Sequence, residues 1–447
     1  MQYYLDPFGC VKNQVDAETM MAVLGNAGWE RAADSAGADL IIINSCGFIE
    51  SAKQESINAV LAYRRMYPQK KILLAGCLAQ RYAAELTESL TEADGFFGNA
   101  DLSLAAWAVS AVMERGDRPV LTGDAAGALP PETAPLPGDR PLLSLPGSAY
   151  VKIAEGCNNR CSFCAIPGIR GPLRSRSVPD ILSECRRLLD RGVRELCLIG
   201  QDLGSFGADR LSAGHNDGGL PGLLEALSTL EGRFWVRLLY IHPDNFPPSI
   251  LELCRCDGRF LPYFDLPFQH GSARILRAMN RRGTAESYLR RIASIRSALP
   301  GAAIRSTFLL GFPGETEEDF QALLDFQDRA RLDWAGAFVY SLEEGTPAYS
   351  LKGRVPRRLA EVRKRLVEEK QIPITQERMD RFIGSTEYVL VEEQIHGEEG
   401  LYLGRLPCQA PEVDGAAVIS ADDPLEPGTF VRGVVFARAG LDLEVRT

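Results

Sequence analysis

Long hydrophobic runs are missing from this sequence of 447 residues. No uninterrupted apolar stretch reaches about 18 residues, the length that a membrane-spanning helix needs. The opening residues, MQYYLDPFGC, also lack the basic flank and apolar stretch of a secretory signal peptide. We therefore expect a cytoplasmic protein with no membrane partner. The chain is longer than one hydrophobic core usually serves, which predicts two to four domains.

Disulfide bonds are a second absence that the sequence predicts. The chain has 11 cysteines, an odd number, and thiols stay reduced in the cytosol. This leaves metal binding, catalysis or plain burial as the uses of the cysteines. The net charge of -10 excludes a general attraction to nucleic acid or to anionic membranes, and it favours a basic partner.

The pattern of apolar and amphipathic segments predicts an α/β protein with three domains. Residues 1–115 alternate strand-like runs with helix-like segments, as in a parallel α/β domain. Residues 148–378 repeat the alternation six times, which predicts a central partial (β/α) barrel. Between them, 116–147 is rich in Pro and Gly and predicts a linker. Residues 379–447 carry short strand-like runs without helices, typical of a small antiparallel β-barrel of the OB type.

One short segment, EGCNNRCSFCAIPGIRG at 155–171, is unusually dense in cysteine. It places Cys157, Cys161 and Cys164 directly after the strand-like YVKIAEG. Three thiolates on one loop suit the corners of an iron–sulfur cluster, and the missing fourth ligand leaves one iron open for a cofactor or substrate. The alternatives are a zinc ion with a distant fourth ligand, or three thiols that bind no metal.

Three further cysteines each follow a strand-like run of the first domain. They are Cys10, Cys46 and Cys77. The carboxyl ends of parallel strands meet at one edge of a sheet, so these thiols are expected at the same edge. A single cysteine at such a position is more often a small buried hydrophobe.

Several of these motifs resemble a known family over essentially the whole chain. The cysteine spacing, the KIAEGC lead-in and the later GFPGET are similar to the radical S-adenosylmethionine enzymes, and within them to the methylthiotransferases. The resemblance implies that Cys157, Cys161 and Cys164 bind a [4Fe-4S] cluster whose open iron binds S-adenosylmethionine. Reduction then cleaves this cofactor to a 5'-deoxyadenosyl radical.

The same resemblance implies a second [4Fe-4S] cluster on the first domain. The matching segments are FGCVKNQVDAE, NSCGFIESAKQES and LAGCLAQRY, so its ligands would be Cys10, Cys46 and Cys77. Its open iron would carry the sulfur that is methylated and inserted. The other five cysteines are not expected to be ligands; they are Cys185, Cys197, Cys254, Cys256 and Cys408.

Two branches of that family differ in their substrate. One modifies a tRNA adenosine, and the other an aspartate of ribosomal protein S-twelve. The segments NSCGFIESAKQESI, CSFCAIPGIRGPLRSR and YIHPDNFP resemble the second branch, and the last domain resembles the TRAM module. Residues 381–447 contain twelve Asp or Glu against five Arg and no Lys. Such a domain would repel a phosphate backbone and attract a basic ribosomal protein, unless its acidic face is simply solvated.

The resemblance also implies contacts to S-adenosylmethionine, each of which could instead be ordinary turn chemistry. The residues concerned are Glu155, Gly200, Gln201, Gly311, Pro313, Phe338 and Tyr340. The segment RGPLRSR adds Arg170, Arg174 and Arg176. These arginines would either anchor a carboxylate of the substrate or cofactor, or form a basic patch at the start of a helix.

Taken together, the motifs predict a transferase that joins a methylthio group to the β-carbon of an aspartate of ribosomal protein S-twelve, free or in the small subunit. It would use S-adenosylmethionine as methyl donor and as radical source, with an electron donor and a sulfur donor as further partners. A tRNA methylthiotransferase is the alternative enzyme, although a tRNA partner is not expected. A nucleic-acid-binding protein with a structural metal site is the alternative of another class.

Overall fold

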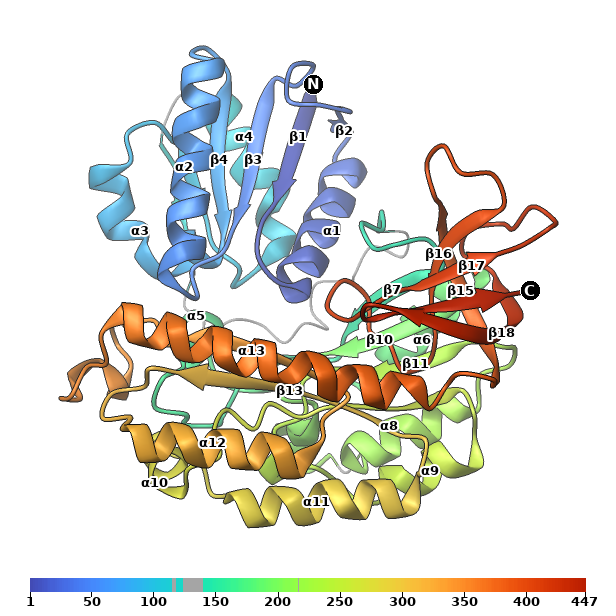
Figure 1. Cartoon of the computed structure of the whole chain (residues 1–447). Helices are drawn as coiled ribbons and strands as arrows, with labels where there is room; N and C mark the ends of the chain where they lie inside the picture. The colour runs from blue at the N-terminus through green and yellow to red at the C-terminus, as the bar shows by residue number, and fades with distance from the viewer. Residues whose placement is uncertain (115–117, 124–139, 216) are drawn as a thin grey trace. The chain divides into compact units, whose positions relative to one another are not determined.

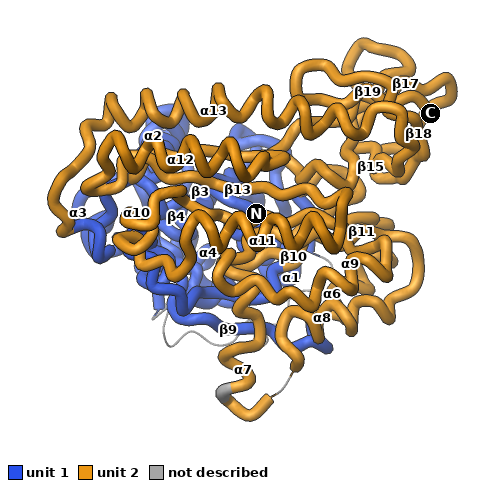
Figure 2. The backbone as a smooth tube through the Cα atoms, turned by 60° about the horizontal axis from the view of Figure 1, so that its bottom comes forward, with its two compact units in different colours: residues 1–143, 152–180, 341–349 blue, residues 144–151, 181–340, 350–447 orange. Residues whose placement is uncertain are grey.

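The computed structural model describes residues 1–114, 118–123, 140–215 and 217–447. The chain forms two compact units, drawn in different colours in Figure 2. The first comprises 1–143, 152–180 and 341–349, and the second comprises 144–151, 181–340 and 350–447. The predicted linker at 116–147 lies largely outside the described residues.

A parallel sheet of six strands organises the first unit. Its strands are β1 (Gln2–Pro7), β2 (Glu30–Arg31), β3 (Leu40–Ser45), β4 (Lys71–Gly76), β5 (Gly95–Phe97) and β6 (Val120–Leu121). Their order is β2-β1-β3-β4-β5-β6, and every neighbouring pair runs parallel. The predicted parallel α/β domain is confirmed. The strand order changes direction between β1 and β3, which creates a switch point at that place in the sheet.

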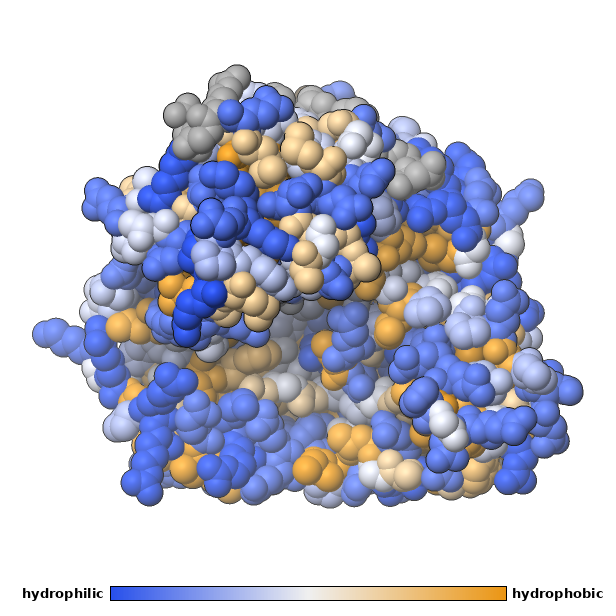
Figure 3. Space-filling model, turned by 90° about the horizontal axis from the view of Figure 1, so that it is seen from above, coloured by the Kyte–Doolittle hydropathy of each residue, from blue (hydrophilic) through white to orange (hydrophobic). Residues whose placement is uncertain are grey.

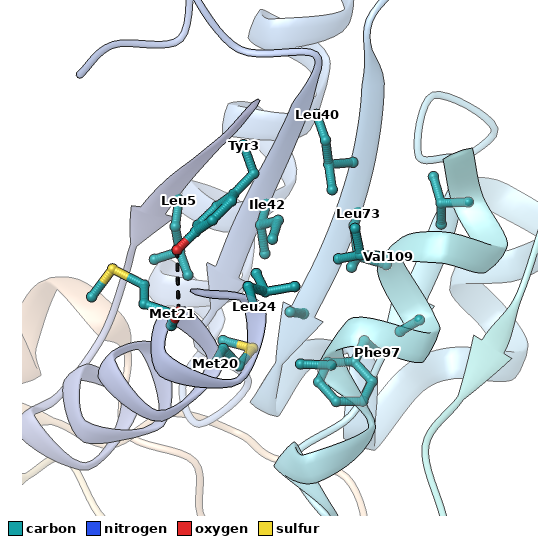
Figure 4. Close-up of a cluster of buried hydrophobic side chains, with 14 of the residues drawn as sticks. Tyr3, Leu5, Met20, Met21, Leu24, Leu40, Ile42, Leu73, Phe97 and Val109 are labelled. Carbon is teal, nitrogen blue, oxygen red and sulfur yellow. Dashed lines mark hydrogen bonds between the residues drawn. The ribbon is translucent and has the colours of Figure 1, made fainter. Parts of the chain in front are cut away.

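Strand β3 shows why this sheet is buried on both faces. Its sequence LIIINS alternates sides: Leu40 and Ile42 point into one apolar cluster, and Ile41 and Ile43 into another. Figure 4 shows the first cluster, where Leu40 and Ile42 lie near Tyr3. A sheet covered on both faces leaves its strand ends as the accessible edge for a ligand.

Helices and two added segments complete the first unit. The helices are α1 (Val11–Asn26), α2 (Glu50–Met66), α3 (Cys77–Ser89), η1 (Leu102–Leu104) and α4 (Ala105–Glu114). The segment 152–180 contributes β8 (Ala154–Glu155), α5 (Ile166–Arg170) and β9 (Arg174–Ser175), with β8 and β9 antiparallel. The segment 341–349 is held by buried Glu343, which pairs with Lys53 at 3.1 Å and with Arg81 at 2.7 Å.

A second six-stranded sheet organises the other unit. Its strands are β7 (Ser148–Lys152), β10 (Glu195–Ile199), β11 (Trp235–Leu238), β12 (Phe260–Asp265), β13 (Ala303–Leu310) and β14 (Trp334–Val339). They follow chain order across the sheet, and β10 to β14 pair in parallel. The six strands predicted for the partial barrel are therefore confirmed.

Helices connect these strands, as Figure 1 shows. They are α6 (Val178–Asp190), η2 (Leu203–Ser205), α7 (Ala208–Ser212), α8 (Gly219–Ser228), η3 (Pro243–Asn245), α9 (Ile250–Cys256), α10 (Ala273–Ala278), α11 (Ala285–Ala298) and α12 (Glu317–Ala330). After the last strand of the sheet come η4 (Pro347–Ser350) and α13 (Arg357–Asp380). Helix α13 packs on β14 at one edge of the sheet and leads into the last part of the chain.

A closed five-stranded barrel ends the chain, as predicted. Its strands are β15 (Thr386–Gln394), β16 (Leu401–Arg405), β17 (Ala417–Ser420), β18 (Phe430–Ala439) and β19 (Asp442–Arg446). The order is β15-β16-β17-β19-β18, with β17 and β19 parallel and the other pairs antiparallel. The barrel packs on the second sheet through Trp235, whose ring centroid lies 4.6 Å from that of Phe430.

Among residues 1–114, 118–123, 140–215 and 217–447, no helix combines the length and the apolar character that crossing a membrane requires. The face seen in Figure 3 is covered mainly by hydrophilic side chains, with hydrophobic ones scattered among them.

Candidate metal centre

Three of the predicted cysteines lie at the carboxyl ends of neighbouring parallel strands. Cys10 follows β1 and precedes α1, Cys46 follows β3, and Cys77 begins α3 directly after β4. Because β1, β3 and β4 are consecutive in the sheet, their three loops share one edge. Cys10 and Cys46 lie on either side of the switch point, where open α/β sheets bind ligands.

A glycine beside each of these cysteines lets the loops approach closely. A Cβ on Gly9 would lie 3.0 Å from the Cβ of Cys46, and a Cβ on Gly47 would lie 2.6 Å from the carbonyl oxygen of Cys77. Gly76 has a φ of +91°, and a Cβ there would come within 2.6 Å of a neighbouring side chain. The close approach of the loops therefore requires glycine at these positions.

Asn13 ties the three loops together, a role that the sequence reasoning missed. Its Nδ2 donates to the carbonyl oxygens of Phe8 at 3.1 Å and Ser45 at 2.8 Å. Its Oδ1 accepts from the Sγ of Cys77 at 3.2 Å, and the side chain is buried. The available signal was spacing, because Asn13 follows Cys10 by three residues and so lies one helical turn away.

Burial makes two of these thiols, those of Cys46 and Cys77, weaker acids than a free cysteine. Burial raises the pKa of Cys77 to about 12, while the charge of Arg170 acts to lower it and neighbouring Cys10 to raise it. Burial also raises the pKa of Cys46. Because the thiolate rather than the thiol is the metal ligand, metal binding at these cysteines must release protons.

The second triad lies on the loop between β8 and α5. Cys157, Cys161 and Cys164 are all half-buried. The loop closes on itself, since the backbone N–H of Cys157 donates to the carbonyl of Gly171 at 3.1 Å and that of Cys164 donates to Cys161 at 3.1 Å. Gly156 has a φ of +73°, and a Cβ there would lie 2.6 Å from the Gly171 oxygen. Local sequence thus specifies a compact loop that presents three sulfurs.

A buried polar network connects this loop to the first triad. Arg170 donates to Glu155 at 3.0 and 3.1 Å, to Asp16 at 2.9 Å and to the Sγ of Cys77 at 3.2 Å. Lys152 pairs with Asp16 at 2.5 Å and with Glu155 at 2.6 Å. Although burial alone would raise it, Arg170 and Lys152 hold the pKa of Glu155 well below its usual range. Glu155, a predicted cofactor contact, therefore lies as a carboxylate between two cations.

The donor set fits two cubic clusters better than two single ions. Cys77 packs against Ala165 and Ile169, and Ala165 directly follows Cys164, so the two triads are close within the first unit. Among the described residues, no three His, Cys, Asp or Glu side chains converge as the ligands of one ion would. The cysteine ligands of a [4Fe-4S] cluster bind separate irons at the corners of a cube, and so they stand further apart.

The other predicted cofactor residues lie at strand ends of the second unit. Gly200 and Gln201 follow β10, Gly311 and Pro313 follow β13, Phe338 lies in β14 and Tyr340 follows β14. Gly200, Gly311 and Pro313 are buried, Gln201 and Tyr340 are half-buried, and Phe338 is 53% exposed. The fold thus brings the carboxyl ends of these strands to one edge of the second sheet.

Glu315 orders the GFPGET loop after β13, a second role that the sequence reasoning missed. The backbone N–H of Gly311 donates to the Oε2 of Glu315 at 2.8 Å, and Arg363 pairs with its Oε1 at 2.7 Å. Thr316 then begins α12 with a capping box in which its side chain accepts from the N–H of Asp319. The signal in the sequence was the acidic residue just before a Thr helix cap.

Three family models match successive parts of the chain. Residues 2–98 match the uncharacterized protein family UPF0004, 151–326 match the Radical SAM superfamily and 383–447 match the TRAM domain. A parallel sheet of six strands with a three-cysteine loop after the first of them defines the chain as a radical S-adenosylmethionine protein.

Curated relatives extend this class to the full length. The chain is 47% identical to the ribosomal protein uS12 methylthiotransferase RimO of Treponema denticola, over 98% of this chain and 99% of that one. It is 41% identical to the protein of the same name from Pelotomaculum thermopropionicum, over 98% and 97%. The chain belongs to the RimO family of ribosomal protein uS12 methylthiotransferases.

A solved structure shares the fold at low identity. The radical S-adenosylmethionine methyltransferase TsrM from Kitasatospora setae, with cobalamin and a [4Fe-4S] cluster bound, superposes with a TM-score of 0.51. The two are 15% identical over 78% of this chain and 76% of TsrM. This likeness supports the architecture alone.

Proposed function

We propose that this chain joins a methylthio group to the β-carbon of an aspartate of ribosomal protein uS12, free or in the small ribosomal subunit. Two [4Fe-4S] clusters and S-adenosylmethionine would be its cofactors. The observation that carries the proposal is the pair of cysteine triads in the first unit, one on three strand ends and one on a single loop, with Cys77 packed beside the residue that follows Cys164.

The chain's residues prepare these two sites in different ways. Cys157, Cys161 and Cys164 would hold one cluster, and Cys10, Cys46 and Cys77 the other, each set leaving one iron without a protein ligand. When bound, the cluster on Cys157, Cys161 and Cys164 supplies the electron that cleaves S-adenosylmethionine. The cluster on Cys10, Cys46 and Cys77 carries the sulfur that is methylated and inserted. The glycines at positions 9, 47 and 76 let the loops that carry Cys10, Cys46 and Cys77 approach one another closely.

The functional division follows the three predicted domains. Residues 1–115 would hold the cluster on Cys10, Cys46 and Cys77. Residues 148–378 would bind S-adenosylmethionine and the cluster on Cys157, Cys161 and Cys164. Residues 379–447 would dock the substrate protein, and 116–147 would connect the first two domains. Gly200, Gln201, Gly311, Pro313, Phe338 and Tyr340 would contact the cofactor. An electron donor and a sulfur donor are required as further partners, and modification of a ribosomal protein would take place in the cytoplasm.

The surface of the terminal barrel supports a basic protein partner. Its exposed acidic residues are Glu393, Glu398, Glu399, Glu412, Asp422, Asp423 and Glu426. Most lie in the β15–β16 turn and the β17–β18 loop, which meet where Ala421 N–H donates to the Gly400 oxygen at 2.9 Å. Of the five arginines, Arg405 is buried in an ion pair with Glu392, and only Arg432 and Arg446 are exposed. Net negative charge at this surface favours a Lys/Arg-rich protein over phosphates.

Iron analysis tests the two sites. After anaerobic reconstitution, the intact chain should hold about eight irons, as two four-iron clusters require. Replacing Cys10, Cys46 and Cys77 by Ala, or the other triad by Ala, should leave about four. Cys256→Ala is the matched control, because Cys256 is exposed at the end of α9 and should not change the iron content. Zinc alone, or an unchanged iron content in either triple variant, would contradict the proposal.

Mass spectrometry tests the substrate. Cells that lack this chain should contain uS12 without its methylthio group, while bulk tRNA keeps its methylthio adenosines. The opposite result, a loss confined to tRNA, would assign the chain to the tRNA-modifying branch instead.

A further inference from the structure

Arg170 lies at the end of α5, six residues after Cys164, and its side chain is 2% exposed. Its two terminal nitrogens point to different parts of the first unit. Nη1 donates to both oxygens of Glu155, two residues before Cys157. Nη2 donates to the Sγ of Cys77 at 3.2 Å. One guanidinium thus bonds both to the neighbourhood of one triad and to a sulfur of the other.

The same nitrogen that meets the sulfur is held by two oxygen acceptors. Nη2 also donates to the Oδ2 of Asp16 at 2.9 Å and to the Oδ1 of Asn13 at 2.7 Å. Both acceptors come from α1, which begins directly after Cys10. The planar fork of an arginine satisfies acceptors in several directions from one rigid group, which a lysine ammonium on a flexible stem does not. The guanidinium therefore has one defined position against Cys77.

The charges around Arg170 balance without the cysteines. Two cations, Arg170 and Lys152, face two carboxylates, Asp16 and Glu155, and all four groups are buried or nearly so. Lys152 already pairs with both carboxylates. The further contact of Arg170 with sulfur is therefore available to offset the negative charge that a cluster on Cys77 would bring into this buried region.

Other arginines of the same segment do not share this position. Arg176 is buried too, but it donates to Asp180 at 2.6 Å and to the carbonyl of Lys152 at 2.8 Å. Arg174 is half-buried and donates to the carbonyl of Arg170 at 3.3 Å. Arg176 thus provides a matched buried arginine for comparison.

We propose that Arg170 is a positioning residue that fixes Cys77 and raises the reduction potential of the cluster held by Cys10, Cys46 and Cys77. The inference rests on the proposed function. Hydrogen bonds to ligating sulfurs and nearby positive charge stabilise the more reduced, more negative form of an iron–sulfur cluster. Through Glu155, the same guanidinium also holds the start of the other cysteine loop.

The test uses the full chain with Cys157, Cys161 and Cys164 replaced by Ala, so that only the first triad can load iron. The midpoint potential of the remaining cluster is measured by a redox titration followed by electron paramagnetic resonance. Adding Arg170→Gln should shift the potential downward, and Arg170→Lys should shift it downward by less, because lysine keeps the charge but loses the fork. Arg176→Gln in the same background should leave the potential unchanged.

Each outcome separates this inference from the proposed function. If the parent triple variant loads no iron, the cluster proposed on Cys10, Cys46 and Cys77 is refuted, and with it the proposed function on which this inference rests. If the parent loads iron and the Arg170 variants keep its potential and its spectrum, the role of Arg170 is refuted. If Arg170→Gln loads no iron while Arg176→Gln does, then Arg170→Lys decides: a lowered potential supports the inference, and an unchanged one overturns it.

Discussion

Arg405 of the terminal barrel offers a sharp test of how the barrel is held in the second unit. Its Nη2 pairs with the Oε2 of Glu195 at 2.5 Å and donates to the Oγ of Ser148 at 2.9 Å, and its Nε pairs with Glu392. Arg237 pairs with the other oxygen of Glu195 at 2.7 Å. Although burial opposes it, Arg405 and Arg237 together lower the pKa of Glu195 to about 2.

Replacing Arg405 by Met should destabilise the second unit strongly. The side chains of Arg405 and Glu195 are 3% and 0% exposed, so water cannot replace the lost partner. Removing one member of a buried ion pair costs about 3–5 kcal/mol, and the apolar contacts of Met would return a part of this. We expect a loss of about 3 kcal/mol in the free energy of unfolding.

Urea unfolding followed by tryptophan fluorescence measures this loss, because tryptophans lie where the barrel contacts the second sheet. Of the four tryptophans, two lie where the barrel packs on the sheet. The ring of Trp235 contacts that of Phe430 in a tilted arrangement, and the indole N–H of Trp334 donates to the carbonyl of Cys408 at 2.7 Å. These indoles should become solvated early in the Met variant.

Arg438→Met is the matched control, because Arg438 is only half-buried, its partner Asp380 is 47% exposed, and such a pair should contribute no more than about 1 kcal/mol. Equal destabilisation by the two variants, or a cost below about 1 kcal/mol for Arg405→Met, would refute the reasoning. In the functional assay, a loosened barrel should raise the KM for the substrate protein more than it lowers 5'-deoxyadenosine release.

Three further predictions concern other sites. Gly76→Ala should cost about 1–3 kcal/mol of backbone strain and reduce iron loading at the first triad; normal iron content would contradict this. Glu315→Gln should remove the buried negative charge beside Arg363, whose other carboxylate partner, Glu317, is exposed, and so lower the free energy of unfolding by about 3 kcal/mol and weaken S-adenosylmethionine binding in calorimetry; unchanged affinity would disconnect this loop from the cofactor. Burial raises the pKa of Asp414 to about 6, so the folded state binds its proton more tightly and stability should rise by up to about 3 kcal/mol as the pH falls from above 6 to about 4. Asp414→Asn should flatten that pH dependence, and an unaltered profile would assign it to other groups.

Local patterns made much of the site predictable from the sequence. Cys157, Cys161 and Cys164 are eight residues from first to last, so no long-range contact is needed to place them on one loop. Cys10, Cys46 and Cys77 were predictable because each ends an apolar run, and parallel strands align their carboxyl ends. The α/β class, the six central strands and the terminal barrel followed from the same periodicity.

The number of charged residues in the terminal barrel differs from the number of charges at its surface. The barrel segment has twelve acidic residues by count, but Glu392 is buried against Arg405 and the side chain of Asp414 is fully buried beside Tyr263. Composition cannot separate such groups from surface charge, because burial depends on which segments pack together. Fewer acidic side chains are therefore available to a basic partner than the twelve counted in the segment, although the surface remains acidic.

The sequence by itself determined the two sets of thiols and the class of sheet that carries them, since both depend on short spacings and on strand periodicity. Only the tertiary structure decided what surrounds those thiols. Asn13, Cys77, Glu155 and Arg170 are separated by up to 157 positions, yet they share direct hydrogen bonds. Such contacts arise when the whole first unit folds and buries them, and no local pattern records which charged side chain will end beside which sulfur.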